Sequence, residues 1–143
     1  MQALVSPTHF PSPRRMAMGI DANRVTLLLA VLERKGGGTF AQHDIYVNIA
    51  GGLSIDEPAL DLGIVAAVLS SQRNVALPFD VALFGEVGLL GEIRSVSQAD
   101  LRAREAAALG FRRVIVPHSN AVEIRADVEV LGVRRIEELA ELL

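Results

Sequence analysis

The apolar and polar positions of the chain repeat with two periods, and together they predict strands that alternate with helices. Residues 44–49 alternate apolar and polar side chains, which predicts a strand with one buried face. Residues 25–33 repeat apolar side chains at intervals of three and four, which predicts an amphipathic helix that ends at the glycines of 36–38. Residues 58–71 are apolar nearly all round, as in a helix buried in the middle of a domain. The pattern therefore predicts an α/β (α+β) fold, a mixed sheet with packed helices.

The remaining segments complete this picture as one domain over 1–143. Three prolines between residues 7 and 13 exclude a helix there, so we expect 1–18 to be an N-terminal arm with a short strand at 2–6. We expect residues 81–87 to form one buried strand, with 92–94 pairing back on it across a turn at 88–91. The other expected elements are a helix over 98–109 capped by Ser95 or Ser97, strands over 114–116 and 128–133, and a terminal helix over 136–143.

Asp61 is the one charged residue inside the apolar segment 58–71, one turn after its start. Burying an unpaired carboxylate costs several kcal/mol, so we expect Asp61 to pair with an arginine, to accept backbone N–H groups, or to face a cleft. A structural role in pairing is the interpretation that we favour. The alternative is an active-site acid.

Composition and charge exclude several classes of protein. The 143 residues include no cysteine, so neither a disulfide framework nor a thiolate zinc site can form. No apolar run approaches the roughly 20 residues that a membrane helix needs, and the N-terminus does not resemble a signal peptide. We therefore expect a cytoplasmic protein with no membrane partner. The net charge of −3 argues against a dedicated nucleic-acid binder, although clustered arginines could still form one basic face.

Neither the glycine run at 36–38 nor the histidines form a recognisable cofactor site. A phosphate-binding P-loop needs a lysine and a Ser or Thr after its last glycine, whereas Thr39 follows here without a lysine. The histidines His9, His43 and His118 are scattered and lack the spacing of metal ligands. The sequence therefore indicates neither a nucleotide site nor a metal site.

The most specific motifs lie in two glycine-containing segments. Residues 51–62 read Gly-Gly-Leu-Ser-Ile-Asp-Glu-Pro-Ala-Leu-Asp-Leu, and residues 85–94 read Gly-Glu-Val-Gly-Leu-Leu-Gly-Glu-Ile-Arg. Together with Ser-Ser at 70–71, they resemble the Lon-protease-like C-terminal domain of the RadA (Sms) family of bacterial DNA repair proteins, and the similarity covers nearly the whole chain. The resemblance implies a Lon proteolytic-domain-like fold, of the ribosomal protein S5 domain 2-like type. It also implies that zinc finger and RecA-like ATPase domains lie upstream, outside this chain, so that ATP, Mg and Zn belong there and no cofactor is expected in this domain.

The resemblance also bears on catalysis. Lon-type peptidases use a serine at the start of the buried helix and a lysine in the helix after the hairpin, whose neutral amine takes the serine proton. Matching the motifs puts Ala59 at the serine and Asp100 at the lysine, and neither side chain can serve. Nothing in the family pattern brings Lys35, the chain's single lysine, to another serine. We therefore expect no catalytic residue and no enzymatic activity in this domain.

The family implies a role in homologous recombination. By this resemblance the full protein is a hexameric, ATP-driven DNA motor that promotes branch migration and works with the recombinase RecA. This domain is then the scaffold of a homo-oligomer, a hexameric ring, that adds sequence-independent contacts to single- or double-stranded DNA. Phosphate contacts need positive groups, and the candidates are Arg14, Arg15, Arg94, Arg102 and Arg104.

Two alternatives of other classes remain. One is a residual Lon-like serine peptidase, and the other is a protein-interaction platform that never touches DNA. Four phenylalanines bear on any interaction role, because they lie in expected turns or strand edges and could form an apolar contact patch: Phe10, Phe40, Phe79 and Phe84. Each one taken alone fits the core better.

Overall fold

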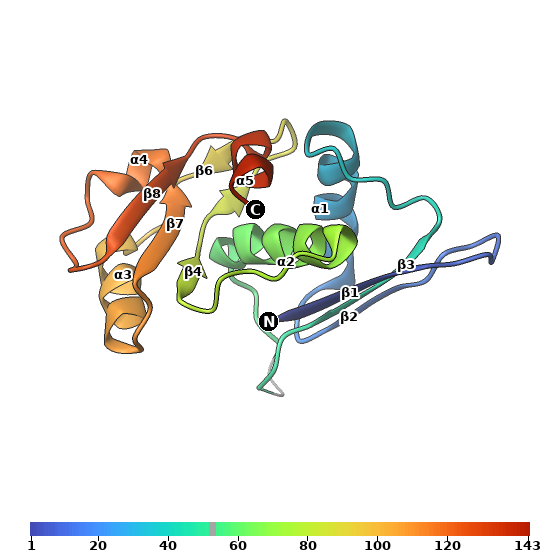
Figure 1. The fold of residues 1–143 in the computed structure, drawn as a ribbon, viewed down its shortest axis with the longest axis horizontal. Coiled ribbons are helices and arrows are strands. Elements are labelled where there is room, and N and C mark those ends of the chain that lie inside the picture. Colours follow the sequence, from blue (N-terminus) through green and yellow to red (C-terminus); the bar gives the residue numbers. More distant parts are fainter. Residues whose placement is uncertain (52–53) are drawn as a thin grey trace.

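In the computed structural model, which describes residues 1–51 and 54–143, two three-stranded sheets flank a central helix (Figure 1). We call the sheet of order β1-β3-β2 sheet A and the sheet of order β4-β7-β8 sheet B. The strands of sheet A are β1 (Gln2–Pro7), β2 (Arg15–Met18) and β3 (His43–Asn48), and those of sheet B are β4 (Val81–Leu83), β7 (Arg113–Pro117) and β8 (Glu129–Val133). A separate hairpin joins β5 (Glu86–Val87) to β6 (Ile93–Arg94).

Helices pack against these strands. They are α1 (Ala22–Lys35), α2 (Asp61–Arg73), α3 (Ala99–Ala108), α4 (His118–Ala121) and α5 (Ile136–Leu142), and a short 3-10 helix, η1 (Pro58–Leu60), leads into α2. Sheet A is mixed, because β1 runs antiparallel and β2 parallel to β3, while sheet B is parallel throughout. The expected mixed α/β fold is thus confirmed. No helix among the described residues is long and apolar enough to cross a membrane.

The helix α2 is the centre of the core, as its apolar composition predicts. It packs against β1 of sheet A, and α1, α5 and the β5 strand contact its other sides. Its buried apolar residues are Leu62, Ile64, Val65, Ala66, Val68 and Leu69. Fully burying a side chain of Leu, Ile or Val stabilises a fold by about 1.5–3 kcal/mol, so this one helix carries a large part of the core.

The other predicted elements around sheet A are also confirmed. In β3, Ile45 and Val47 are buried on the face that packs on the helices. The helix α1 begins after Asp21, whose carboxylate accepts the N–H of Asn23, and ends at Gly36. The turn that we expect at the paired glycines of 51–52 includes residue 52, which lies outside the described residues.

Sheet B has its own smaller core, which α3 covers. The alanines Ala99, Ala103 and Ala106 face Val114 and Val116 of β7. Side chains this small let the helix lie close to the sheet. Sheet B and α3 form one end of the molecule in Figure 1, and sheet A with the loop between β1 and β2 forms the other.

The segment 81–87 does not form one strand, contrary to the sequence-based expectation. The backbone of Gly85 turns toward the central helix, where its N–H donates to the carbonyl of Ala59 at 2.9 Å and its carbonyl accepts the N–H of Leu62 at 3.1 Å. A backbone engaged in this way cannot continue the ladder of sheet B. The segment therefore contributes β4 to sheet B and β5 to the separate hairpin, whose turn at 88–91 is as predicted.

Three local expectations also change. Residues 1–18 contain two strands of sheet A, β1 and the unpredicted β2, and not only an arm with one short strand. Neither serine caps α3, because Gln98 in the left-handed conformation (φ 59°) precedes that helix without a side-chain cap. Phe40 and Phe84 are buried, whereas Phe10 and Phe79 are exposed, so the four phenylalanines do not form one surface patch.

Candidate functional site at the start of the central helix

Ala59 lies in η1, where the chain enters the central helix. Its side chain is 2 % exposed, and its carbonyl accepts the N–H of Gly85. Its own N–H donates to the Glu57 carboxylate at 3.0 Å, so Glu57 acts as the cap of this helix start. The position that matches the serine of Lon-type peptidases therefore carries a buried methyl group. Backbone hydrogen bonds on both sides hold it in place.

Arg102 reaches this turn from α3. Its guanidinium donates to the Glu57 carboxylate at 3.2 Å and to the carbonyl of Ser97 at 2.9 Å. The hydrogen bond from the Ala59 N–H, together with the nearby Arg102 guanidinium, holds the pKa of Glu57 below its usual value. The Glu57–Arg102 ion pair thus joins the start of the central helix to the sheet B end of the molecule.

Asp100, which matches the lysine position, lies in the first turn of α3 but serves the loop before β8. Its carboxylate accepts the N–H of Arg125 at 2.6 Å and of Ala126 at 3.2 Å, and it pairs with Arg104 at 2.6 Å. The N–H of Arg125 and the charge of Arg104 lower the pKa of Asp100. None of the hydrogen bonds that the structure describes for Asp100 goes to η1.

Asp61 is the deepest charge of the site, with a side chain only 1 % exposed. It accepts a hydrogen bond from Arg24 Nε at 2.9 Å, a second from Arg24 Nη2, and the N–H of Val87 at 3.0 Å. The hydrogen bonds with Asp61 raise the pKa of Arg24 above its ordinary value. The structural role that we favoured for Asp61 is confirmed, with both an arginine and a backbone amide as partners.

The hollow at this helix start is small and acidic. It encloses about 150 Å³, and the described residues that line it include Asp21, Asp56, Glu57 and Asp61, with Arg24 as the only cation among them. Four of these charged side chains already serve the fold, because Arg24 and Asp61 pair with each other, Asp21 caps α1 and Glu57 caps η1. Among the described residues, no group of three or more His, Asp or Glu side chains is arranged to hold a metal ion.

The chain's lysine and its paired serines lie away from this helix start. The side chain of Lys35 packs against Gly91 in the hairpin turn. Ser70 donates its hydroxyl to the carbonyl of Val75 at 2.6 Å, and Ser71 accepts the N–H of Val5 at 2.9 Å, both at the far end of α2. No hydrogen bond within the described residues joins Lys35 to a serine.

Four of the five arginines proposed to contact DNA are occupied by groups of the chain itself. Arg94 pairs with Glu86 and Glu92, and Arg102 and Arg104 pair as described above. Arg15 donates to the carbonyls of Phe40 and His43. Arg14 differs, because its exposed guanidinium lies 5.4 Å from the centre of the Phe10 ring and makes no ion pair among the described residues.

The sequence predicted that Asp61 pairs with an arginine, but it identified neither Arg24 as that partner nor the pair between Glu57 and Arg102. Arg24 and Asp61 are 37 residues apart, and Glu57 and Arg102 are 45 apart, so no local pattern links either pair. One signal was available for Glu57, since an acidic residue directly before a proline is typical of a helix start.

Comparison with known proteins gives consistent results. Residues 17–120 match the family model described as subunit ChlI of Mg-chelatase. Proteins named DNA repair protein RadA are similar over almost the entire chain: that of Halalkalibacterium halodurans is 49 % identical over 99 % of it, that of Pseudomonas aeruginosa 46 % over 100 %, and that of Escherichia coli 43 % over 96 %. The chain spans only about a third of the length of these relatives, 32 %, 32 % and 30 % respectively.

Proposed function

The chain belongs to the ChlI family and, within it, to the Lon-protease-like C-terminal domains of RadA proteins, and we propose that it acts in DNA repair as a non-catalytic part of a longer protein. In that protein it holds the subunits of a hexameric ring together and adds sequence-independent DNA contacts during branch migration in homologous recombination. The ATPase activity, with its ATP and Mg, the Zn site and the link to the recombinase RecA belong to the longer protein.

The observation that carries the non-catalytic role is the chemistry at the start of the central helix. A Lon-type peptidase needs a hydroxyl there and a neutral amine beside it. Ala59 offers a buried methyl group, and Glu57 and Arg102 form an ion pair over the same turn. A charged guanidinium cannot act as the general base, because arginine is not deprotonated in proteins.

The contacts of the remaining polar groups support the same proposal. Asp100 is engaged with the 125–126 backbone, and Lys35 lies against the hairpin turn. The side chains that could have supplied a proton acceptor thus stabilise neighbouring loops. We infer that the peptidase fold of this family has a structural role in this domain and not a catalytic one.

The contribution to DNA binding is the finer part of the proposal, and Arg14 is its main candidate. Phosphate contacts require a cation that is free to exchange water and counterions for phosphate. Arg14 meets this condition, whereas the other four candidates would first have to leave carboxylates or carbonyls of their own chain. Because four of the five candidate arginines are bonded to groups of their own chain, the structure also favours a second candidate function, a protein-interaction platform without DNA contact.

Two measurements test the proposal. Anisotropy titrations with single- and double-stranded oligonucleotides at several salt concentrations should show weak binding that does not depend on sequence and falls as salt rises. If the chain does not bind DNA even at the lowest salt concentration, the function that remains is the protein-interaction platform. A fluorophosphonate probe should label no serine, and labelling of any serine would restore the residual peptidase.

A further inference from the structure

The side of sheet A that faces away from the core carries the chain's single tyrosine. Ile45 and Val47 of β3 are buried in the core, so Tyr46 between them points to the opposite side of the sheet. Leu4 of β1 and Met16 of β2 lie directly beside Tyr46 in one row across the three strands. Leu4 and Met16 are each more than half exposed, and Tyr46 is half-buried between them.

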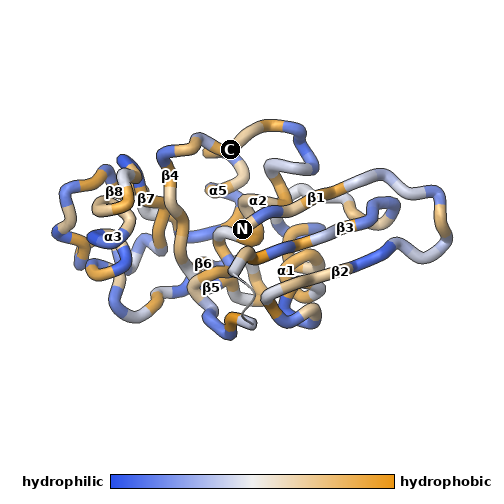
Figure 2. Tube along the Cα trace, turned by 90° about the horizontal axis from the view of Figure 1, so that it is seen from below, coloured by the Kyte–Doolittle hydropathy of each residue, from blue (hydrophilic) through white to orange (hydrophobic). Residues whose placement is uncertain are grey.

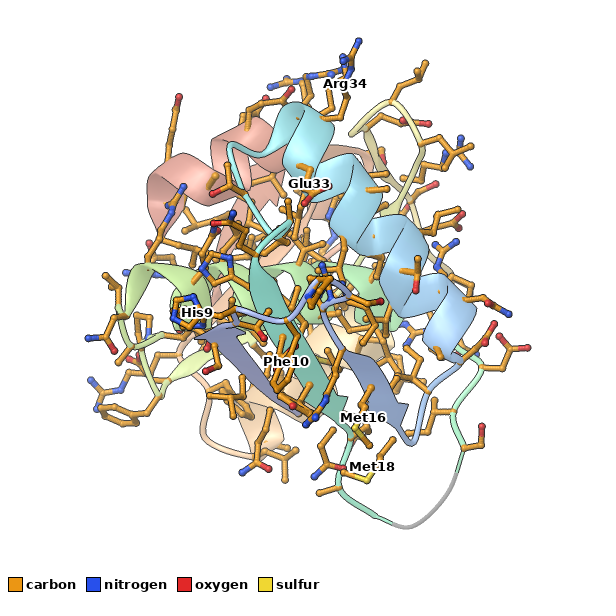
Figure 3. The ribbon with its side chains drawn as sticks, turned by 90° about the vertical axis from the view of Figure 1, so that its right-hand side faces the viewer. His9, Phe10, Met16, Met18, Glu33 and Arg34 are labelled. Atoms are coloured by element: carbon orange, nitrogen blue, oxygen red, sulfur yellow. The ribbon has the colours of Figure 1, made fainter. Side chains whose placement is uncertain are left out.

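This side of the sheet is a groove without a charged group in its lining. It encloses about 410 Å³. The Asn48 amide donates to Gln2 Oε1 at 3.4 Å, so these two polar side chains satisfy each other and stay neutral. Figure 3 shows Met16 and Met18 on the sheet A part of the molecule. We call the following side chains the outer face: Gln2, Leu4, Met16, Met18, Tyr46 and Asn48.

The segments that build the outer face are almost free of acidic residues. Residues 1–20 and 45–55 contain none of the 17 acidic residues of the chain, although its net charge is −3. Asp44 is the exception within β3, but it is only 9 % exposed and its carboxylate accepts the N–H of Arg14 at 2.7 Å. A polyanion can therefore approach this side of sheet A without meeting an exposed carboxylate from these segments.

A cation and a second aromatic ring lie at one end of the outer face. Arg14 comes two residues before Met16, so it lies about 7 Å along the strand from the row of Tyr46. The Arg14 guanidinium is 5.4 Å from the centre of the Phe10 ring, and Phe10 is 63 % exposed. In Figure 2 the loop between β1 and β2 extends beyond the sheet, and the chain is hydrophilic where this loop enters β2.

This combination of groups suits a single strand of nucleic acid. Aromatic rings stack on unpaired bases of any sequence, and a neighbouring cation contacts the phosphates. The bases of a duplex already stack on one another, so a ring on a protein surface cannot reach their faces. Methionine side chains are flexible and can follow the uneven surface of bases and sugars.

We propose that the outer face binds single-stranded DNA, with one base stacked on Tyr46, another on Phe10 and a phosphate on Arg14. The inference rests on the proposed DNA contact of this domain and deepens it, because it names the form of DNA and the residues that hold the bases. Stacking supplies affinity that needs no large positive charge, which agrees with the net charge of −3.

The intrinsic fluorescence of the chain reports on this contact directly. Tyr46 is the single tyrosine and the chain has no tryptophan, so the fluorescence comes from the proposed stacking residue. An oligothymidylate of roughly 20 nucleotides is longer than one such site and is the probe. After correction for DNA absorption, the single strand should quench Tyr46, and a duplex of the same length should not.

Substitution of Tyr46 separates stacking from charge. Tyr46→Leu should weaken binding of the oligothymidylate about 5-fold or more, because the stacking of one base is lost. Tyr46→Phe keeps the ring and should keep the affinity. Tyr46→Leu should also leave the slope of log K against log salt unchanged, since stacking releases no counterions. Thermal unfolding must show both variants to be folded.

A second pair of variants does not depend on a half-buried position. Phe10→Leu removes the exposed ring beside Arg14, and it should weaken binding of the single strand about 5-fold or more. Phe79→Leu is the matched control, because Phe79 is an exposed phenylalanine that precedes β4 of sheet B. It should bind the oligothymidylate as the wild type does.

The outcomes separate this inference from the proposed function. If neither form of DNA binds at the lowest salt concentration, both the proposed DNA contact and the stacking site are wrong. If anisotropy shows that the single strand binds while Tyr46 fluorescence and the affinity of Tyr46→Leu stay unchanged, only the stacking site is wrong. Binding of the duplex as tight as that of the single strand would also overturn the stacking site and leave phosphate contacts alone.

Discussion

Arg24 and Asp61 form a pair that ties α1 to the start of the central helix, with Arg24 Nε 2.9 Å from the Asp61 carboxylate. The same carboxylate accepts the N–H of Val87, so one buried side chain fixes α1, α2 and the hairpin relative to one another. Removing one partner of such a pair leaves the other uncompensated, which typically costs 3–5 kcal/mol for a buried pair.

Replacing Asp61 by alanine should therefore lower the free energy of unfolding by about 3 kcal/mol, at the lower end of that range because Arg24 is partly exposed. The control is Asp56→Ala, an exposed carboxylate of the same hollow, which should change stability by less than about 0.5 kcal/mol. Urea unfolding of both variants measures the difference. Equal effects would show that Asp61 does not hold the site together.

Glu57 gives the site a dependence on pH. Its folded-state pKa is lowered, chiefly by the Ala59 N–H, so its contribution is present above the unfolded pKa and is lost as pH falls through the folded pKa. Glu57→Ala should cost about 1 kcal/mol at pH 7, a modest value because the side chain is 39 % exposed and water screens its pairing with Arg102. The difference in the free energy of unfolding between the variant and the wild type should disappear as the pH is lowered below about 4. If this difference stayed constant into strong acid, the ionised Glu57 carboxylate would not be the cap that stabilises the helix start.

Restoring the serine alone should not restore a peptidase. In Ala59→Ser the hydroxyl enters a buried position with no amine beside it, so no general base takes its proton. We expect no labelling by a fluorophosphonate probe and no peptide cleavage. Rapid labelling of Ser introduced at this position would show that the scaffold still holds a working base.

The candidate DNA arginines should differ in their effect. Arg14→Ala should weaken binding to oligonucleotides for all sequences and reduce the slope of log K against log salt by about one, as expected for loss of one phosphate contact. Arg104→Ala is the matched control, because its guanidinium already pairs with Asp100, and it should leave the slope unchanged. If Arg104→Ala reduced the slope and Arg14→Ala did not, the phosphate contact would lie on α3.

Gln98 should be a site where glycine stabilises the fold. Its φ of 59° lies in the left-handed region, which disfavours side chains with a Cβ atom. Gln98→Gly should raise the free energy of unfolding by about 0.5–1 kcal/mol, whereas Gln98→Ala should give no gain. Thermal unfolding at one pH compares the three proteins, and a glycine variant less stable than the alanine variant would contradict the assignment of strain.

The elements that the sequence predicted well are those set by local pattern. The nearly all-apolar composition of 58–71 indicated the buried helix α2, because a helix that is buried on all sides has few polar positions. The alternation of 44–49 indicated β3, because a strand with one buried face alternates apolar and polar residues. The lone Asp61 inside an apolar helix was predictable as a paired charge for the same reason, since its cost when unpaired is large.

Features that depend on distant partners could not be predicted in this way. The strand expected over 81–87 breaks because Gly85 bonds to Ala59 and Leu62 in another element. The strand β2 is only four residues long and owes its pairing to β3. The partners of Asp61 and Glu57 lie 37 and 45 residues away, which no periodicity reveals.

The most direct test of the scaffold function is the light-scattering mass of the purified chain over a range of concentrations. The account predicts a mass that rises with concentration toward six times the 15.3 kDa of one chain. A mass that stays at 15.3 kDa at the highest concentration reached would contradict it.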